Sequence, residues 1–454
     1  MLDTTAELLG PDGPVAQYLQ GFSVRIQQQE MAQAIADAAT RQQDLVVEAG
    51  TGTGKTFAYL VPAMCSGRKV IVSTGTKNLQ DQLFHRDIPL LRKALKILIK
   101  IALLKGRGHY MCTERLRTAL EIAPQQEPHL VPRLQALEQF ARNSVRGDIA
   151  ECDVLAEGDP LWFRVTSTAD NCLGTECPDY QDCFVMQARR EAQAADLVVI
   201  NHHLLLSDMA LSEEGFGEIL PAADLCVVDE AHQLADIASQ FFGVGISSQQ
   251  FVDLAQDVQR SYALEINETR DVELLCHQLN KAARDLRLVF GDTLRRGPWH
   301  EIYNNQNIRL CIERLLQCSD ELGEQLQVLA ERSKDLENAN QRCVNLAARL
   351  REVTRDLDGE QIQWYEVHRR SLSLHLTPLD IAPAFTEHKQ RKGGNWIFTS
   401  ATLTVARDFD HFCQRLGLLD VSTRYFESPF DYAHQAMLFL PKGLPDPNSI
   451  GYTE

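Results

Sequence analysis

The sequence contains no apolar run long enough to cross a membrane. A spanning helix needs about 18 or more apolar residues in succession, and the 454 residues hold no such run. The N-terminus also lacks the basic residues and apolar stretch that mark a signal peptide. We find no internal repeat and no low-complexity segment. These absences predict a cytoplasmic protein without a membrane span.

A net positive charge is absent as well. The chain has 45 Lys and Arg against 62 Asp and Glu, a formal net charge of −17. This balance argues against a protein that coats nucleic acid indiscriminately, because positive charge dominates such binding. Any grip on DNA or RNA must therefore come from local basic patches in a cleft. The length and the hydrophobic content of 44% allow two or three domains with a sizeable core.

A glycine-rich segment, EAGTGTGKT, occupies residues 48–56 after an apolar run. Glycines let the backbone curl so that N–H groups point at phosphates, and the following helix adds its positive N-terminus. Lys55 would reach the β- and γ-phosphates, and the Thr56 hydroxyl would ligate Mg²⁺. ATP is therefore the first expected ligand, and a glycine-rich turn with an incidental lysine is the weaker alternative. The predicted nucleotide-binding residues are Gly50, Thr51, Gly52, Thr53, Gly54, Lys55 and Thr56.

Short apolar runs alternate with helix-prone stretches along the chain. This alternation predicts a parallel sheet covered on both faces, so the expected class is α/β. Two long interruptions break it. The first, about 106–190, contains cysteines and has little strand signal; the second, about 235–380, is polar and helix-prone, with apolar residues at helical spacing. The predicted strands are residues 45–48, 70–73, 101–104, 197–200, 225–228 and 396–398.

Two acidic residues follow a predicted strand in the segment LCVVDEAH, residues 225–232. The strand would deliver Asp229 and Glu230 to its carboxyl end, where ligands of open α/β sheets bind. Asp229 would hold the Mg²⁺ shell, and Glu230 would orient and deprotonate the attacking water. His232 lies where it could sense the γ-phosphate. An isolated Asp-Glu pair is usually a solvated loop or helix cap, but downstream of a phosphate loop it predicts a nucleotide-hydrolysing site.

A third segment, WIFTSATL at residues 396–403, ends a predicted strand in Ser400-Ala-Thr402. Alone it would be a hydroxyl-rich turn. Together with the phosphate loop and DEAH, it resembles the motif that couples ATP hydrolysis to nucleic-acid movement in superfamily 2 helicases. Ala49 also stands where the commonest phosphate-loop pattern has glycine, and AxxGxGKT is the form seen in helicase-type motors.

Two more segments resemble parts of the same enzymes. Residues 72–82 are similar to the segment that touches the nucleic-acid backbone through hydroxyls and main-chain N–H groups, with Thr74 and Thr76 as candidates. Arg25 and Gln28 fall where these enzymes bind adenine, although the two residues between them differ from the usual ones.

Four cysteines lie within the first interruption, one of them distant and three closely spaced. Structural zinc usually takes two close pairs, and here the first pair is missing. A [4Fe–4S] cluster, in which each iron needs one Cys, is the favoured interpretation, with zinc and unliganded thiols as alternatives and Cys152 as a rival ligand. The remaining seven cysteines are most simply core or surface residues. The predicted ligands are Cys112, Cys172, Cys177 and Cys183.

From about Gly21 to Phe430, these motifs resemble the XPD/DinG family of iron–sulfur superfamily 2 DNA helicases. The resemblance implies a RecA-like P-loop motor with an inserted iron–sulfur domain and a helical arch. It implies 5′ to 3′ movement on single-stranded or forked DNA, driven by ATP and Mg²⁺. A monomeric motor is expected, with replication or repair proteins as candidate partners. The expected parts are motor lobe 1 (1–105, 191–234 and 381–405), the iron–sulfur domain (106–190), the helical arch (235–380) and the start of motor lobe 2 (406–454).

The expected second lobe is largely missing, because no Gly- and Arg-rich segment that could supply an arginine finger follows residue 402. We therefore expect the 454 residues to be an N-terminal portion, with slow turnover by itself. No nuclease domain is expected before the adenine segment.

A basic and aromatic group between the motor sheet and the first cysteine comprises Lys105, Arg107 and Tyr110. We expect it to line a pore for one DNA strand, although such residues are often ordinary solvated surface. Three hypotheses remain at this point. The favoured one is a DNA-repair helicase; the others are an ATP- and DNA-binding module that does not translocate, and an iron–sulfur protein whose redox state gates DNA binding.

Overall fold

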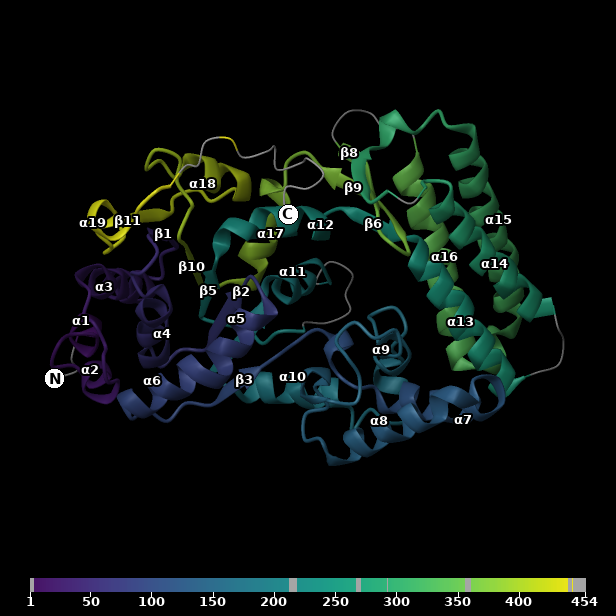
Figure 1. Ribbon diagram of the computed structural model, residues 1–454, viewed down its shortest axis with the longest axis horizontal. Coiled ribbons are helices and arrows are strands. Elements are labelled where there is room, and N and C mark those ends of the chain that lie inside the picture. Colours follow the sequence, from purple (N-terminus) through teal and green to yellow (C-terminus); the bar gives the residue numbers. More distant parts are fainter. Residues whose placement is uncertain are drawn as a thin grey trace.

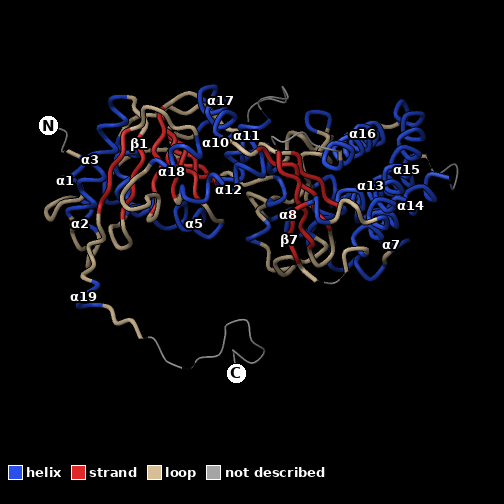
Figure 2. The backbone as a smooth tube through the Cα atoms, turned by 90° about the horizontal axis from the view of Figure 1, so that it is seen from above, coloured by secondary structure: helices blue, strands red, loops and turns tan. Residues whose placement is uncertain are grey.

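The computed structural model describes residues 4–211, 219–266, 271–291, 293–355, 361–439 and 443. Its strands form a seven-stranded sheet and a separate four-stranded sheet (Figures 1 and 2). A search of the described residues finds no helix that is both long and apolar enough to cross a membrane.

The larger sheet is parallel at every pairing and has the order β11-β1-β10-β5-β2-β4-β3. The six predicted strands all lie in it, which confirms the α/β class. Strands β1, β2, β4, β5 and β10 are buried along their whole length, as expected for a sheet covered on both faces. Its strands are β1 Leu45–Ala49, β2 Val70–Thr74, β3 Ile101–Leu103, β4 Leu197–Asn201, β5 Leu225–Asp229, β10 Asn395–Ser400 and β11 Ser422–Phe426.

Side chains of one strand alternate between the two faces of this sheet. In β1, Leu45 and Val47 pack in one core while Val46 packs in another. Both faces are therefore covered by helices, and all strand carboxyl ends meet at one edge. The helices associated with the sheet are α1 Thr5–Leu8, α2 Pro14–Tyr18, α3 Ile26–Arg41, α4 Lys55–Cys65, α5 Lys77–Gln82, α6 Ile88–Leu95, α11 His202–Leu211, α12 Leu234–Phe241, α17 Ala382–Lys392 and α18 Asp410–Leu416.

The first interruption separates β3 from β4 and is mainly helical. Its residues share a continuous apolar core with one face of the large sheet, so it is packed onto the sheet. Its helices are α7 Thr113–Gln126, α8 Val131–Asn143, α9 Trp162–Val165 and α10 Phe184–Ala194.

The second interruption, between β5 and β10, holds a bundle of long helices together with the four-stranded antiparallel sheet β6-β9-β8-β7. The sequence predicted helices only, so this sheet was missed. Its strands bury one face against the bundle and leave the other polar, a pattern that merges into a generally polar segment. The elements are α13 Ser248–Glu265, α14 Asp271–Leu288, α15 Gln306–Leu329, α16 Lys334–Thr354, β6 Val244–Ser247, β7 Arg295–Pro298, β8 Gln361–Val367 and β9 Leu372–Pro378.

The C-terminal part of the described chain corrects one expected boundary. Residues 406–454 were expected to begin a second lobe, but β11 pairs in parallel with β1 from Leu45↔Ser422 to Ala49↔Phe426. The chain as far as Phe426 therefore completes the sheet of the first lobe. The short helix α19, Tyr432–Gln435, follows; residues 440–442 and 444–454 lie outside the described part.

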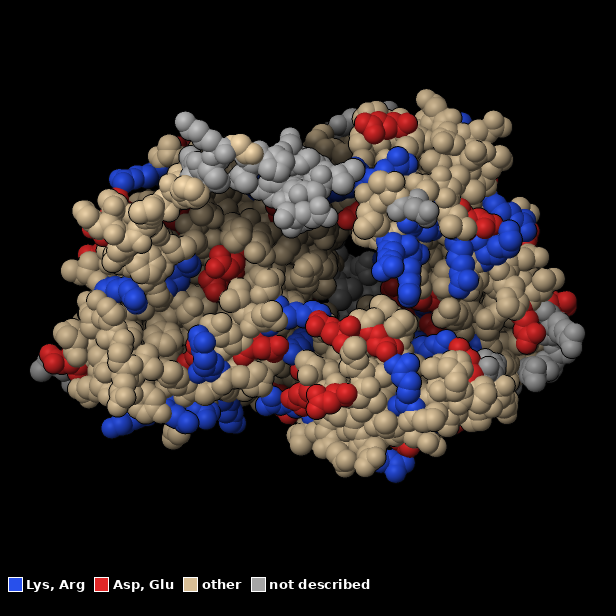
Figure 3. Space-filling model, viewed as in Figure 1, with Lys and Arg blue, Asp and Glu red and all other residues tan. Residues whose placement is uncertain are grey.

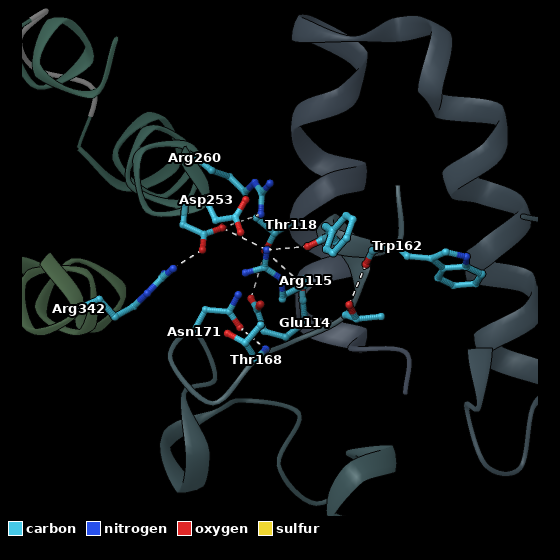
Figure 4. A network of polar contacts seen from close by, with 12 residues as sticks. Glu114, Arg115, Thr118, Trp162, Thr168, Asn171, Asp253, Arg260 and Arg342 are labelled. Carbon is cyan, nitrogen blue, oxygen red and sulfur yellow. Dashed lines mark hydrogen bonds and ion pairs between the residues drawn. The ribbon is translucent and has the colours of Figure 1, made fainter. Parts of the chain in front are cut away.

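The two insertions touch at a cluster of charged side chains, which we call the Asp257 cluster: Asp257, Arg115, Arg260 and Arg342 (Figure 4). Arg115 belongs to α7, whereas the other three belong to α13 and α16. The contact joins the β3–β4 insertion to the helix bundle. In the space-filling view the face is hollowed near its centre, between the large sheet and the bundle, with Lys and Arg side chains beside the hollow (Figure 3).

Candidate nucleotide site and its link to nucleic acid

The phosphate loop connects β1 to α4 at the carboxyl edge of the sheet. Gly52 and Gly54 have φ of 86° and 82°, a region that glycine adopts without the strain other residues incur. Thr53 Oγ1 donates to the Gly50 carbonyl at 2.7 Å, and Lys55 Nζ lies 3.4 Å from the Ala49 carbonyl oxygen. The loop is thus curled as a phosphate cradle, with Lys55 and Thr56 opening the helix as predicted.

Gln28 lies directly against this loop. Its Nε2 donates to the Gly54 carbonyl at 2.9 Å, and a Cβ at position 54 would clash with the same amide. The side-chain Oε1 is buried without a hydrogen-bond partner among the described residues. Arg25, which precedes the first turn of α3, lies near the same glycine. Both predicted adenine residues therefore reach the nucleotide side of the loop.

Asp229 stands at the end of β5, facing the loop. Tyr59, from α4, donates to its Oδ2 at 3.0 Å, while Oδ1 is buried without a partner among the described residues. Burial, followed by the neighbouring Glu230 charge, raises the pKa of Asp229 to about 6. A buried carboxylate with a vacant oxygen and a nearby lysine fits a Mg²⁺ ion held together with Thr56. The sequence did not single out Tyr59, because its role depends on a contact 170 residues away.

Glu230 and the residues after it connect two sequence motifs. Ser400 Oγ donates to Glu230 Oε2 at 3.2 Å and lies 2.8 Å from His232 Nδ1. His232 is also 3.3 Å from the Glu230 carboxylate. Glu230 has φ of 54°, which is strained for a residue with a side chain. The predicted water-activating carboxylate is therefore positioned by the Ser-Ala-Thr segment, whose Thr402 is exposed.

Glu48 makes a second link to that segment, which sequence reasoning missed. Its Oε2 accepts hydrogen bonds from the backbone N–H groups of Leu403 and Thr404, the latter at 2.6 Å. The carboxylate is buried at the end of β1. Its presence beside the phosphate loop in EAGTGTGKT was the only sequence signal.

The segment after β11 covers the phosphate loop and was also missed. Ser428 Oγ donates to the Thr51 carbonyl at 2.7 Å, and Tyr432 OH lies 2.7 Å from Thr51 Oγ1. A Cβ at Gly52 would clash with the Phe430 ring. Glycine is therefore required here by close approach as well as by φ.

The segment expected to touch nucleic acid follows β2. Thr76 is exposed and caps α5, accepting from the Leu79 N–H at 3.3 Å. Thr74 is fully buried, with its hydroxyl unpartnered among the described residues. The surface available to a backbone phosphate is therefore Thr76 and the first turn of α5, not Thr74.

The basic and aromatic group before Cys112 lies differently from the expectation. Lys105 is 6% exposed and bridges Asp81 and Asp148 at 3.0 and 2.8 Å. Tyr110 is buried and accepts from the Lys105 backbone N–H at 3.0 Å. These two residues hold the start of the insertion together, so their assignment as DNA contacts is corrected. Arg107 is partly exposed and donates to Cys172 Sγ at 2.8 Å.

The four predicted cluster ligands are free, partly exposed cysteines in one insertion. Burial raises the pKa of the Cys112 thiol to about 12, and the nearby Cys172 adds to the shift. Burial also raises the pKa of Cys177, again with a smaller contribution from Cys172. Their donor chemistry fits an iron–sulfur cluster. Within the described ranges, however, no three His, Cys, Asp or Glu side chains are arranged to hold a metal ion.

Known proteins share this arrangement of motifs. The DEAD/DEAH box helicase family matches residues 25–123. The ATP-dependent DNA helicase YoaA of Haemophilus influenzae is 42% identical over 98% of this chain and 70% of its own length. The Escherichia coli YoaA is 43% identical over 97% and 69%, respectively. The chain belongs to the YoaA/DinG helicase family.

Another member, the ATP-dependent helicase DinG of Mycobacterium tuberculosis, is 31% identical over 95% of this chain and 68% of its own length. Among solved structures, a chain titled XPD_Helicase aligns with 89% of this chain and 62% of its own, at 14% identity and a TM-score of 0.44. A second, titled Truncated XPD, aligns with 87% of this chain and 98% of its own, at 14% identity and a TM-score of 0.41. The family resemblance drawn from the motifs is confirmed.

Proposed function

We propose that this protein is an ATP-driven DNA helicase motor that moves 5′ to 3′ along a single strand. The observation that carries the proposal is the junction of Glu230, His232 and Ser400, which joins the hydrolytic carboxylate to the Ser-Ala-Thr segment. The names of the YoaA and DinG relatives, DNA helicases that depend on ATP, support the same function.

The residues divide the hydrolytic work among them. Lys55 and the loop N–H groups position the phosphates, and Thr56 and Asp229 would hold Mg²⁺, which neutralises developing charge on the phosphates. Glu230 orients a water molecule and accepts its proton. His232, 2.8 Å from Ser400 Oγ, makes the Ser-Ala-Thr segment sensitive to the position of that carboxylate.

DNA binding rests on local chemistry, because the whole chain is acidic. We assign the backbone contact to Thr76 and the exposed first turn of α5, which includes Lys77. The hollow beside the bundle gives one strand a path, with Lys and Arg at its rim (Figure 3). Phosphate contacts of this kind hold a strand without reading its sequence.

We further propose that Cys112, Cys172, Cys177 and Cys183 hold a [4Fe–4S] cluster in the β3–β4 insertion, which serves as the iron–sulfur domain, and that the bundle serves as the arch. Three of these thiols influence one another's titration, and Arg107 donates to one of them. Replacing any of the four by Ser should release iron, measured per chain after anaerobic purification. Cys311→Ser in the bundle is the matched control. Stoichiometric zinc without iron would contradict the assignment.

Unwinding assays test the motor function. Forked DNA with a 5′ tail should be opened in the presence of ATP and Mg²⁺, and a fork with only a 3′ tail should not. Lys55→Ala should abolish opening, whereas Lys281→Ala, an exposed lysine of the bundle, should leave it intact. Single-strand affinity should fall steeply with salt. Equal opening from either tail would overturn the polarity, and ATP-independent opening would overturn the motor.

A further inference from the structure

We infer that His202 is a positioning residue that links the nucleotide site to the nucleic-acid segment at Ser73–Thr76, an inference that rests on the proposed function. His202 is the first residue after β4 and is fully buried. Strand β2 lies between β4 and β5, so His202 sits where the ends of these strands meet (Figure 1). One of those ends leads to Thr76 and the other to Asp229.

The contacts of the ring reach both sides. Its Nδ1 lies 2.8 Å from the hydroxyl of Ser73, which is itself fully buried. The ring also interacts with the backbone of Asp229 and Glu230. Burial lowers the pKa of His202 to about 4, so the imidazole is neutral at pH 7. A neutral imidazole has one donor and one acceptor nitrogen, and can therefore join two polar groups on opposite sides.

A second contact runs parallel to the first. A Cβ on Gly75 would lie 2.5 Å from Gln233 Oε1, so the Gln233 side chain rests directly on the Gly75 backbone. Gln233 ends the short 3₁₀-helix Ala231–Gln233 that follows Glu230. The segment Ser73–Thr76 is thus held against the DEAH segment at two successive residues.

This arrangement gives the link a mechanical consequence. Glu230 has a left-handed backbone conformation that persists only where its surroundings enforce it. His202 contacts that strained residue and Ser73 at the same time, and Thr76 lies three residues beyond Ser73. A shift of Glu230 as the nucleotide changes is therefore transmitted to the phosphate-binding turn, and strand binding there biases Glu230 in return.

A buried histidine that merely fills space is the competing explanation. The two are separated by measuring single-strand affinity with and without the non-hydrolysable nucleotide Mg²⁺·AMP-PNP, and taking the ratio. In the unaltered protein we expect a ratio of about tenfold, within the usual range for coupled sites. His202→Phe, which keeps a ring and removes both nitrogens, should bring the ratio to about one. His203→Phe, at the adjacent exposed histidine, should leave it unchanged.

Ser73→Ala provides a second variant if His202→Phe does not fold. It should lower the same ratio, and the double variant should be no worse than either single one, because one link is removed in each case. A normal ratio in His202→Phe or Ser73→Ala, or fully additive losses, would overturn the inference. A ratio of one in the unaltered protein would instead contradict the proposed function, and the inference with it.

Discussion

Two buried aspartates of this protein have opposite electrostatic surroundings. Asp229, at the end of β5, faces Glu230 and one tyrosine hydroxyl, and its pKa is raised to about 6, first by burial. At Asp257, in α13, burial alone would raise the pKa, but nearby arginines outweigh it and lower the pKa. Arg342, Arg115 and Arg260 lie 2.8, 3.1 and 3.5 Å from its carboxylate.

The difference separates a binding site from a structural contact. The Asp257 charge is already matched by guanidinium groups, so it holds α7 against the bundle and has no need of a ligand. The Asp229 charge is matched incompletely, so its carboxylate is stabilised when a cation arrives. Burial alone does not distinguish the two; the charges around them do.

The largest effect is expected at Asp257. Asp257→Asn would leave three arginine side chains close together without their counter-charge, and should cost about 3–5 kcal/mol of unfolding free energy. Urea denaturation measures the loss. The matched control is Asp320→Asn, whose exposed ion pair with Arg351 joins α15 to α16 and should contribute about 0–1 kcal/mol. Equal losses in the two variants would show that the Asp257 cluster is ordinary surface.

Asp229→Asn should act in the opposite direction on stability. The folded pKa of about 6 lies above the ordinary 3.8, so Asp229 opposes folding once the pH exceeds 6, by roughly 3 kcal/mol at most. The variant should therefore be more stable than the unaltered protein at pH 8 without Mg²⁺. It should also be less able to bind Mg²⁺·ATP. Denaturant unfolding at pH 8 checks the first point, and a destabilised variant would contradict it.

The pH dependence of metal binding sharpens the comparison further. A raised folded pKa means that the Asp229 contribution to stability is complete below pH 3.8 and is lost as the pH rises through 6. Mg²⁺ competes with the same proton. Its affinity in the presence of ATP should therefore fall about tenfold between pH 7 and pH 5. Calorimetric titration at the two pH values would reveal a flat profile if Asp229 did not bind the ion.

The smallest expected effect is that of Tyr59→Phe. The Tyr59 hydroxyl donates to Asp229 and favours its ionised form, so removing it should shift the pH midpoint of Mg²⁺ affinity upward. The same titration series measures the shift. Tyr262→Phe, in the bundle, is the control and should leave the midpoint in place. A downward shift after Tyr59→Phe would contradict this role of the hydroxyl.

Local sequence carried much of the central architecture. The strands that lead into Gly50, Asp229 and Ser400 are continuous apolar runs, and the glycine spacing specifies the loop between the first strand and its helix. Their convergence at one edge follows from the geometry of a parallel sheet. These features depend on residues close together in the chain, so a single sequence is sufficient to predict them.

Contacts between distant residues were not predictable in this way. Lys105 reads as a basic residue at the entrance of an insertion, yet Asp81 and Asp148 come from separate segments and neutralise it. Strand β11 is only five residues long and half exposed, so its pairing with β1 left no strong pattern. Glu48, Tyr59 and His202 likewise acquire their roles only when remote strands are brought side by side.

Nucleotide binding at Lys55 and Asp229 is tested most directly by titrating the protein with ATP and Mn²⁺, a paramagnetic substitute for Mg²⁺, and counting bound Mn²⁺ by electron paramagnetic resonance. We predict one nucleotide-dependent Mn²⁺ per chain, lost in both Lys55→Ala and Asp229→Asn. Asp257→Asn, studied at a temperature where it remains folded, should retain the ion. Undiminished Mn²⁺ binding in Asp229→Asn would contradict the assignment of this site.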